Sequence, residues 1–122
     1  MKNGAILDTE NIDGNTPLHL ACREGHIGCV KLLISLGAKE SNGWNENSLL
    51  HFAAESGKLD LIDFFVDKDY DVNAKNLDNE TPLHLVCIGC EDEKINCVIK
   101  LLQNHAALTT EYNLIKIQKM LV

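Results

Sequence analysis

The sequence predicts an all-α repeat solenoid built from helix-turn-helix units. The first observation is a motif that occurs three times: TPLHLAC at 16–22, SLLHFAA at 48–54 and TPLHLVC at 81–87. The second is the spacing of the motifs, 32 and 33 residues, which is the length of one supersecondary unit. The third is a second apolar segment after each motif, at 30–34, 62–66 and 98–102. Pairs of helices this short cannot bury their apolar faces alone, so the units must stack.

The first helix of each unit begins at a capping residue. These caps are Thr16, Ser48 and Thr81. Their hydroxyl groups can accept a backbone hydrogen bond, and Pro17 and Pro82 follow at the first helical position, where no N–H is needed. Gly25 and Gly57 suit a left-handed C-cap, which predicts that the first helix ends there. A second helix follows, and in the first unit its apolar face carries Ile27, Val30, Leu33 and Ile34.

A period near 33 residues with TPLH at the helix start resembles the ankyrin repeat. The first unit also matches the family pattern at further positions: Asp-Gly-Asn at 13–15, Ala21, Gly25-His26, Val30, Leu32-Leu33 and Gly37-Ala38. Residues 71–74, Asp-Val-Asn-Ala, match the family's hairpin segment. The resemblance covers nearly the whole chain. It implies an all-α repeat solenoid whose helix-turn-helix repeats are joined by β-hairpin-like loops.

The resemblance divides a single domain, residues 1–122, into repeats. Three full repeats are expected at 11–42, 43–75 and 76–108. Residues 1–10, which include Gly4-Ala5, resemble the tail of a preceding partial repeat. Residues 109–122 are expected to form a divergent C-terminal cap, with Leu114, Ile117 and Leu121 on one face of a short helix.

The loop before the second repeat departs from the family pattern. The turn glycine of the family is Gly14 in the first repeat, but Glu46 and Asn79 stand in its place in the others. Asparagine tolerates a positive φ and glutamate does so poorly, so we expect a distorted loop in the middle repeat. The 32-residue spacing also removes one residue near 42–44. In the third repeat, three additional residues enlarge the turn between the helices around 91–93.

Histidine and cysteine side chains raise the question of a metal site. Four of them have spacings that would converge on one continuous helix: His19, Cys22, His26 and Cys29. Gly25 interrupts that helix. The repeat also explains the cysteines, since Cys22 takes a small buried position and Cys29 and Cys97 take the apolar position that Leu61 holds in the middle repeat. We therefore expect no metal and no cofactor.

Catalytic chemistry is not expected either. His19, His51 and His84 recur once per repeat, and helices packed roughly 8–10 Å apart would not let two of them share a substrate atom. The resemblance implies instead that they form hydrogen bonds that lock adjacent repeats. Cys87 and Cys90 form a C-x-x-C pair at the C-terminal end of a helix, where the helix dipole disfavours a thiolate. Cys90 does not match a buried position of the repeat, so we expect it to react faster with thiol reagents than the other four cysteines.

Composition excludes several classes of partner. The formal net charge is −7 and the chain has a single arginine, Arg23, so a nucleic-acid backbone is not an expected ligand. No segment has the length and apolarity of a transmembrane helix, and the N-terminus lacks the apolar core of a signal peptide. Five cysteines without a disulfide spacing fit a reducing compartment. An intracellular, cytoplasmic location is expected, and a nuclear one stays open.

The resemblance implies that a partner protein docks on the hairpin tips and the exposed side of each first helix, which together form the concave face. Equivalent positions of successive repeats then form columns across this face. Four residues before each cap stand Ile12, Trp44 and Leu77. Three before stand Asp13, Asn45 and Asp78, and one before stand Asn15, Asn47 and Glu80. Seven after each cap stand Arg23, Glu55 and Ile88.

The column of Ile12, Trp44 and Leu77 is apolar in all three repeats, and we call it the apolar ridge. An aligned row of exposed apolar side chains is typical of an interaction site, and tryptophan is enriched at interface hot spots. Acidic neighbours favour a partner with a basic rim around an apolar pocket. The alternative is that the three side chains fold over and pack on neighbouring hairpins, which the deletion beside Trp44 would promote.

The leading prediction is a protein-protein interaction module that acts as an adaptor, a scaffold or a stoichiometric inhibitor and performs no chemistry. The alternative is an ankyrin segment of a larger protein that targets or regulates an enzymatic or channel domain elsewhere. Uncapped ends of a short stack also favour self-association.

Overall fold

The computed structural model of the chain describes residues 7–88 and 94–104. Within these ranges the secondary structure is helical, with no β-strand. The elements are α2 (Pro17–Arg23), α3 (Ile27–Ser35), the 3-10 turn η1 (Trp44–Glu46), α4 (Leu49–Ser56), α5 (Leu59–Asp67), α6 (Pro82–Cys87) and α7 (Ile95–Gln103). Four predicted features lie outside the described residues: the C-terminal cap at 109–122, the Gly4-Ala5 tail, the enlarged turn at 91–93 and the reactive Cys90.

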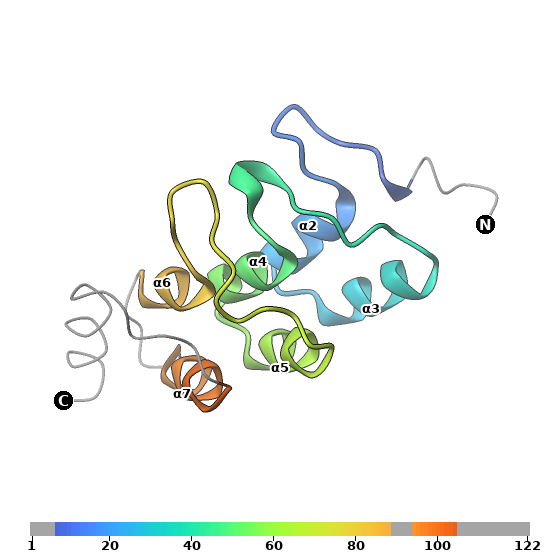
Figure 1. The fold of residues 1–122 in the computed structure, drawn as a ribbon. Helices are drawn as coiled ribbons and strands as arrows, with labels where there is room; N and C mark the ends of the chain where they lie inside the picture. The colour runs from blue at the N-terminus through green and yellow to red at the C-terminus, as the bar shows by residue number, and fades with distance from the viewer. Residues whose placement is uncertain (1–6, 89–93, 105–122) are drawn as a thin grey trace.

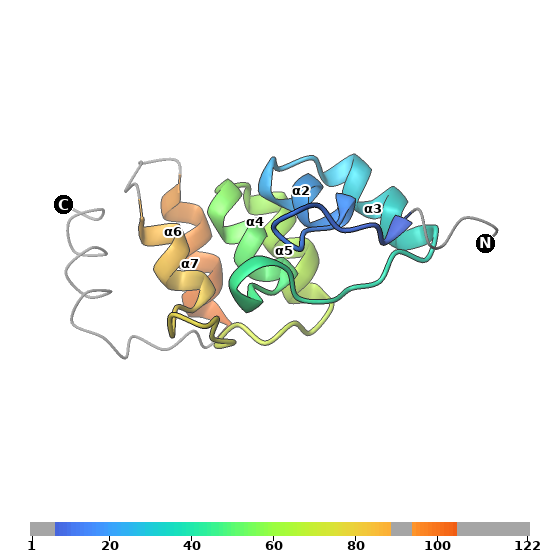
Figure 2. The ribbon, with the colours of Figure 1, turned by 90° about the horizontal axis from the view of Figure 1, so that it is seen from above.

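The helices form three stacked pairs, which confirms the predicted solenoid. Helices α2, α4 and α6 form one row and α3, α5 and α7 form a second (Figure 1). Helix α4 packs between α2 and α6, and α5 packs on α7. Seen from above, the pairs follow one another along a single direction (Figure 2). The loops before α2, α4 and α6 all project from the same side of the first row (Figure 1).

These three projecting loops, residues 11–15, 43–47 and 76–80, are called fingers here. One backbone hydrogen bond closes each finger, from its first N–H to its last carbonyl: Asn11 to Asn15 (2.8 Å), Gly43 to Asn47 (2.9 Å) and Asn76 to Glu80 (3.0 Å). The fingers therefore have the closure of a hairpin without a β-ladder. Because the closing bond is at the same position in all three, each finger presents equivalent residues in the same order.

The first helix of each repeat starts with the predicted cap. The hydroxyl groups of Thr16, Ser48 and Thr81 accept a hydrogen bond from the backbone N–H of the histidine three residues later. The Nδ1 atom of that histidine accepts the backbone N–H of the cap residue in return. Each cap and its histidine thus satisfy two helix-terminal donors reciprocally. Gly25 and Gly57 have positive φ angles of 77° and 71° at the ends of the first helices, as predicted.

The core runs continuously through the stack. Its fully buried side chains include Leu18, Leu50 and Leu83 from equivalent positions of the first helices, with Phe52 and Phe65 in the middle repeat. Burial of one such side chain stabilises the fold by about 1.5–3 kcal/mol. Phe52 also lies against the ring of His19, at 5.3 Å between ring centroids, so the core extends directly beneath the fingers.

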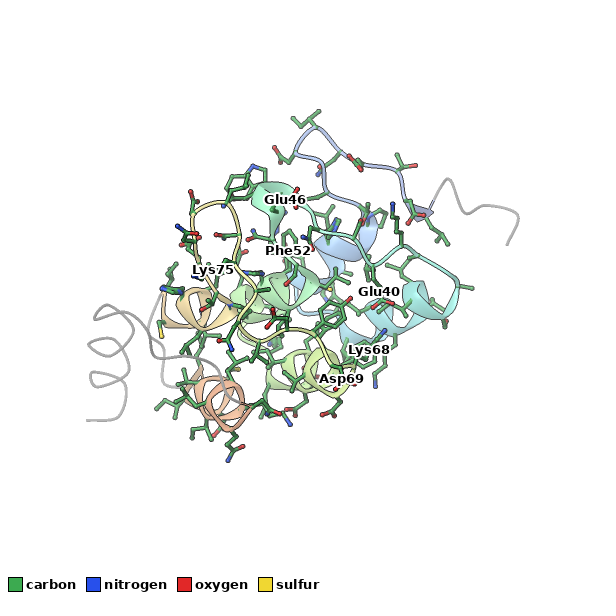
Figure 3. The ribbon with its side chains drawn as sticks, viewed as in Figure 1. Glu40, Glu46, Phe52, Lys68, Asp69 and Lys75 are labelled. Atoms are coloured by element: carbon green, nitrogen blue, oxygen red, sulfur yellow. The ribbon has the colours of Figure 1, made fainter. Side chains whose placement is uncertain are left out.

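A polar contact ties the first two repeats together away from the fingers. One carboxylate oxygen of Glu40 accepts hydrogen bonds from Lys68 Nζ (2.9 Å) and from the Tyr70 hydroxyl (2.7 Å). Figure 3 shows Glu40 and Lys68 facing each other across the two repeats. Partial burial of Glu40 opposes its ionisation, but the two hydrogen bonds outweigh this and lower the pKa of its carboxyl group. Burial and the bond to Glu40 raise the pKa of Tyr70.

The prediction for Cys29 is wrong. Its equivalents Leu61 and Cys97 are fully buried, whereas Cys29 is exposed. Cys97 lies against the preceding repeat, where its thiol donates to the Gly57 carbonyl (3.4 Å). Cys29 belongs to the first full repeat, and no helix pair stacks on that side of it among the described residues. A side chain at this position of the repeat is therefore buried only where a preceding repeat covers it, as in the second and third repeats.

Candidate protein-binding surface

Histidine side chains hold the fingers in line. His19 Nε2 donates to the Ser41 carbonyl (2.7 Å), and His51 Nε2 donates to the Glu80 carbonyl (2.8 Å). Since Nε2 carries the proton, Nδ1 is free to accept the N–H of the cap residue, and the ring is neutral. Burial lowers the pKa of His51, which favours this neutral form. The His51 bond joins the second repeat to the third, as the resemblance implies, whereas the His19 bond ends at Ser41, still within the first repeat and two residues before the second finger.

Asn15 and Asn47 add a second set of contacts between fingers. The Oδ1 atom of Asn15 accepts the Trp44 backbone N–H (2.8 Å), and Oδ1 of Asn47 accepts the Asn76 side-chain amide (2.8 Å). Only 2% of Asn15 and 4% of Asn47 is exposed. Both side chains are therefore largely covered in the free chain. Their side chains are used to join one finger to the next.

The middle finger is distorted, as the replacement of glycine by Glu46 predicts. Asn45 and Glu46 both have left-handed backbones, with φ angles of 61° and 57°. The outer fingers have a single left-handed residue each at the equivalent position, Gly14 and Asn79. The unusual turn aims Asn45 at the third finger. Its carbonyl accepts the Leu77 N–H (3.0 Å) and its side-chain amide donates to Asp78 Oδ2 (2.9 Å).

The three side chains of the apolar ridge are exposed on the fingers. Ile12 is fully exposed, Leu77 is 72% exposed and Trp44 is 54% exposed. Ile12 and Leu77 therefore do not fold over a neighbouring finger. The Trp44 ring is about half covered, so one part of it is supported by the protein and the rest is offered to solvent. A supported ring is held in place at a lower entropic cost than a free one.

Trp44 forms a wall of two pockets. The first, which we call the acidic pocket, has a volume of about 340 Å³ and lies between the second and third repeats. Its lining includes Trp44, Leu85, Ile88, Glu55, Asp78, Glu80 and Lys94. The second, of about 300 Å³, lies between the first and second repeats and is lined by Asp13, Asn15, Arg23 and Trp44. Side chains from successive fingers and first helices thus enclose hollows on either side of one aromatic ring.

The structure gathers most of the sequence-predicted surface into these two pockets. Ten of the twelve predicted residues line one or both, including the largely buried Asn15 and Asn47, and the exceptions are Ile12 and Leu77. Sequence reasoning missed Leu85 and Lys94. Leu85 sits four residues after its cap, on the part of the first helix that turns toward the fingers. Lys94 follows the three additional residues of the third repeat in the sequence, so the column spacing no longer applies to it.

Lysine stems, those of Lys58 and Lys94, cover the glycines that end the first helices of the first two repeats. A Cβ atom on Gly57 would lie 2.9 Å from Lys94 Cε, and one on Gly25 would lie 2.6 Å from Lys58 Cγ. Each lysine stem therefore lies against the glycine of the preceding repeat. A side chain there would clash as well as strain the positive φ. The contact brings the Lys94 side chain to the edge of the acidic pocket, where its ammonium donates to the Ile88 carbonyl at 3.4 Å.

The acidic pocket carries unneutralised negative charge. Among the residues that the structure describes, Glu55, Asp78 and Glu80 form no ion pair. Within the same part of the chain, no three histidine, cysteine, aspartate or glutamate side chains gather as a metal site requires. No described helix is long and apolar enough to cross a membrane.

Comparison with known proteins identifies the family of the chain. The family model for ankyrin repeats (3 copies) matches residues 1–76 and 50–116. Transient receptor potential cation channel subfamily A member 1 of Homo sapiens is 33% identical over 99 residues, covering 78% of this chain and 9% of that protein. NF-kappa-B inhibitor zeta of Homo sapiens is 33% identical over 122 aligned residues, covering 82% and 17%. Ankyrin repeat and SOCS box protein 5 of Homo sapiens is 32% identical over 114 residues, covering 93% and 33%.

The chain spans a third or less of the length of these three relatives. The family match, by contrast, extends over almost the whole chain. The stacked helix pairs, the capping boxes at TPLH and SLLH, and the fingers agree with that match. Taken together, they show that the chain belongs to the ankyrin repeat family.

Proposed function

We propose that this chain binds a partner protein through the apolar ridge and the two pockets beside it. It would act as an adaptor, a scaffold or a stoichiometric inhibitor inside the cell, and would carry out no reaction of its own. The observation that carries the proposal is Trp44, a half-exposed aromatic ring that walls both pockets. Ankyrin repeats are protein-interaction modules, and the face that they present here is the one formed by the fingers and the first helices.

The composition of this face is that of an interface. The lining of the acidic pocket holds a tryptophan, Leu85 and Ile88 together with carboxylates and amides. An apolar centre with a polar rim is the usual anatomy of a protein-protein interface, and a tryptophan at the centre is a typical hot spot. The fingers are joined by His19, His51 and their backbone acceptors, so the face is organised before a partner arrives. Preorganisation reduces the entropic cost of binding.

Affinity capture from the source cell with the wild-type chain and Trp44→Ala tests this proposal. Truncation of a hot-spot tryptophan is expected to weaken binding by at least about 2 kcal/mol, roughly 30-fold, and the captured partner should disappear. Ile99→Ala is the matched control, because Ile99 is 40% exposed and lies on α7, outside both pockets. Both variants should melt within a few degrees of the wild type. If Trp44→Ala and Ile99→Ala retain the same partner equally, the ridge is not the binding site.

A second role is favoured by the coverage of the relatives. The chain corresponds to 9% of a cation-channel subunit and 17% of NF-kappa-B inhibitor zeta, which are much longer proteins. In this role the repeats would target or regulate an enzymatic or channel domain elsewhere in a larger protein. The full transcript decides the matter: an open reading frame that continues into a further domain supports this role, and in-frame stop codons on both sides of the 122 codons exclude it.

Self-association through the end of the stack is a further part of the proposal. Leu32 and Leu36 are 58% and 40% exposed on the first repeat, together with Cys29. In the middle repeat the equivalent of Cys29, Leu61, is fully buried against the repeat before it. Light scattering should therefore show dimers whose population falls in Leu32→Asp. A wild-type chain that stays monomeric at high concentration would rule this out.

A further inference from the structure

We infer that the acidic pocket receives an arginine side chain of the partner protein. The inference rests on the proposed function and specifies its chemistry. The pocket lining combines three kinds of group that a single side chain must match: the Trp44 ring, the apolar side chains of Leu85 and Ile88, and three carboxylates. Arginine matches all three, because it has a planar cation at the end of an apolar stem.

Charge favours a cation here. Glu55, Asp78 and Glu80 line the pocket and form no ion pair among the described residues. Two of these carboxylates are held in place, since Asn45 donates to Asp78 (2.9 Å) and Asn76 donates to Glu80 (2.9 Å). Each carboxylate has further lone pairs with which to accept a bond from a ligand.

The cation already present does not neutralise the pocket. Lys94 is the one basic side chain in its lining, and it donates to the Ile88 carbonyl instead of forming an ion pair with a described carboxylate. Three carboxylates against one lysine leave a surplus of negative charge. The pocket on the other side of Trp44 has no such surplus, because Asp13 and Arg23 carry one charge of each sign. A basic side chain is therefore directed to the acidic pocket.

The aromatic wall distinguishes arginine from lysine. A guanidinium group can stack on the half-exposed indole of Trp44 and still direct its N–H groups to the carboxylates that line the same pocket. An ammonium group is a compact, strongly hydrated charge and cannot satisfy both at once. Leu85 and Ile88 provide apolar surface for the methylene stem.

Titration of the isotope-labelled chain with small probes tests the inference without the partner. The probes are Nα-acetyl-arginine methylamide, the lysine analogue and the citrulline analogue, which has the shape of arginine without its charge. Trp44 is the only tryptophan, so its indole N–H gives one unambiguous signal. The arginine probe is expected to shift this signal to saturation with millimolar affinity, weakened by added salt, and the citrulline probe should bind at least about tenfold more weakly.

Charge-neutralising variants locate the site. Glu55→Gln with Glu80→Gln should weaken the arginine probe about tenfold, because two carboxylate contacts are lost while the side-chain shapes remain. Glu24→Gln with Glu46→Gln is the matched control, with the same change in net charge at two exposed glutamates outside both pockets. Equal affinity for the arginine and citrulline probes overturns the inference. Equal effects of the two double variants, or tighter binding of the lysine probe, overturn it as well.

The outcome is independent of the test of the proposed function. If the arginine probe binds as expected but Trp44→Ala still captures the partner, the pocket prefers arginine as inferred, but the apolar ridge is not where the partner binds. If the probe shows no preference but Trp44→Ala loses the partner, the proposed function stands and the arginine inference fails.

Discussion

Replacement of Glu46 by glycine should stabilise the protein. Glu46 is in the left-handed region at φ 57°, where a Cβ atom lies too close to the following carbonyl oxygen. The equivalent residue of the first finger is Gly14, with φ 81°. The side chain of Glu46 contributes little that glycine would lose. Among the described residues, it accepts one hydrogen bond, from the Asn42 amide at 3.4 Å on the exposed surface.

The size of the effect follows from two opposing costs. Relief of the left-handed conformation returns about 1–2 kcal/mol. Glycine adds about 0.5–1 kcal/mol of backbone entropy to the unfolded chain, which opposes folding. The net stabilisation is about 0.5–1 kcal/mol, equivalent to an increase in melting temperature of about 2–4 °C for a domain of this size. Asn45 keeps its bonds to the third finger in this variant, so the acidic pocket is retained.

Urea unfolding followed by circular dichroism measures the change. Glu46→Gln is the first control, because it removes the charge and keeps the strained backbone, and it should leave stability unchanged. Gly14→Ala is the second, because the nearest side-chain atom would be 3.8 Å from the new Cβ, so only the positive φ is penalised. It should cost about 1 kcal/mol. The reasoning is refuted if Glu46→Gly destabilises the chain or if Glu46→Gln stabilises it equally.

Three further predictions concern single side chains. Cys29 is exposed and should react with a thiol reagent in the native state, whereas burial raises the pKa of the Cys22 thiol to about 12, so Cys22 should react only on unfolding. Burial lowers the pKa of His51 below its ordinary 6.5. The unfolded chain therefore binds more protons, and the free energy of unfolding should fall as the pH drops through 6.5 and below, with a shallower slope in His51→Gln. Tyr70→Phe removes the bond to a partly exposed Glu40 and should cost about 1 kcal/mol in urea unfolding, because solvent screening reduces this charged contact.

Each of these has a contradicting result. A Cys29→Ser chain with as many rapidly reacting thiols as the wild type would contradict the first prediction. A His51→Gln variant whose stability has the wild-type pH dependence would show that other groups set the slope. Equal unfolding midpoints for Tyr70→Phe and wild type would mean that Lys68 alone satisfies Glu40.

The helices and their caps could be predicted because their causes are local. A threonine or serine followed three residues later by histidine forms a reciprocal cap within one turn, and proline at the next position fits the start of a helix without any tertiary contact. The distortion of the middle finger was predictable for the same reason, since Glu46 occupies a position that favours glycine.

The accessibility of individual surface residues could not be predicted in the same way. Asn15 and Asn47 are polar residues in loops, which a sequence presents as exposed, but the next finger covers them and uses their carbonyl groups. Cys29 occupies an apolar column and is exposed because burial there requires a neighbouring repeat. For the two asparagines, the deciding contact comes from a residue of the next repeat, roughly 30 positions away. For Cys29, the described residues include no neighbouring helix pair that could cover it.

The acceptors of the histidine bonds are main-chain atoms, the carbonyls of Ser41 and Glu80. A carbonyl is present whatever side chain its residue carries. The side chains at positions 41 and 80 can therefore be exchanged without loss of the two histidine bonds. Evolution could change what this face recognises one residue at a time, while the stack that supports it keeps its geometry. The same property makes the acidic pocket a practical place to redesign specificity.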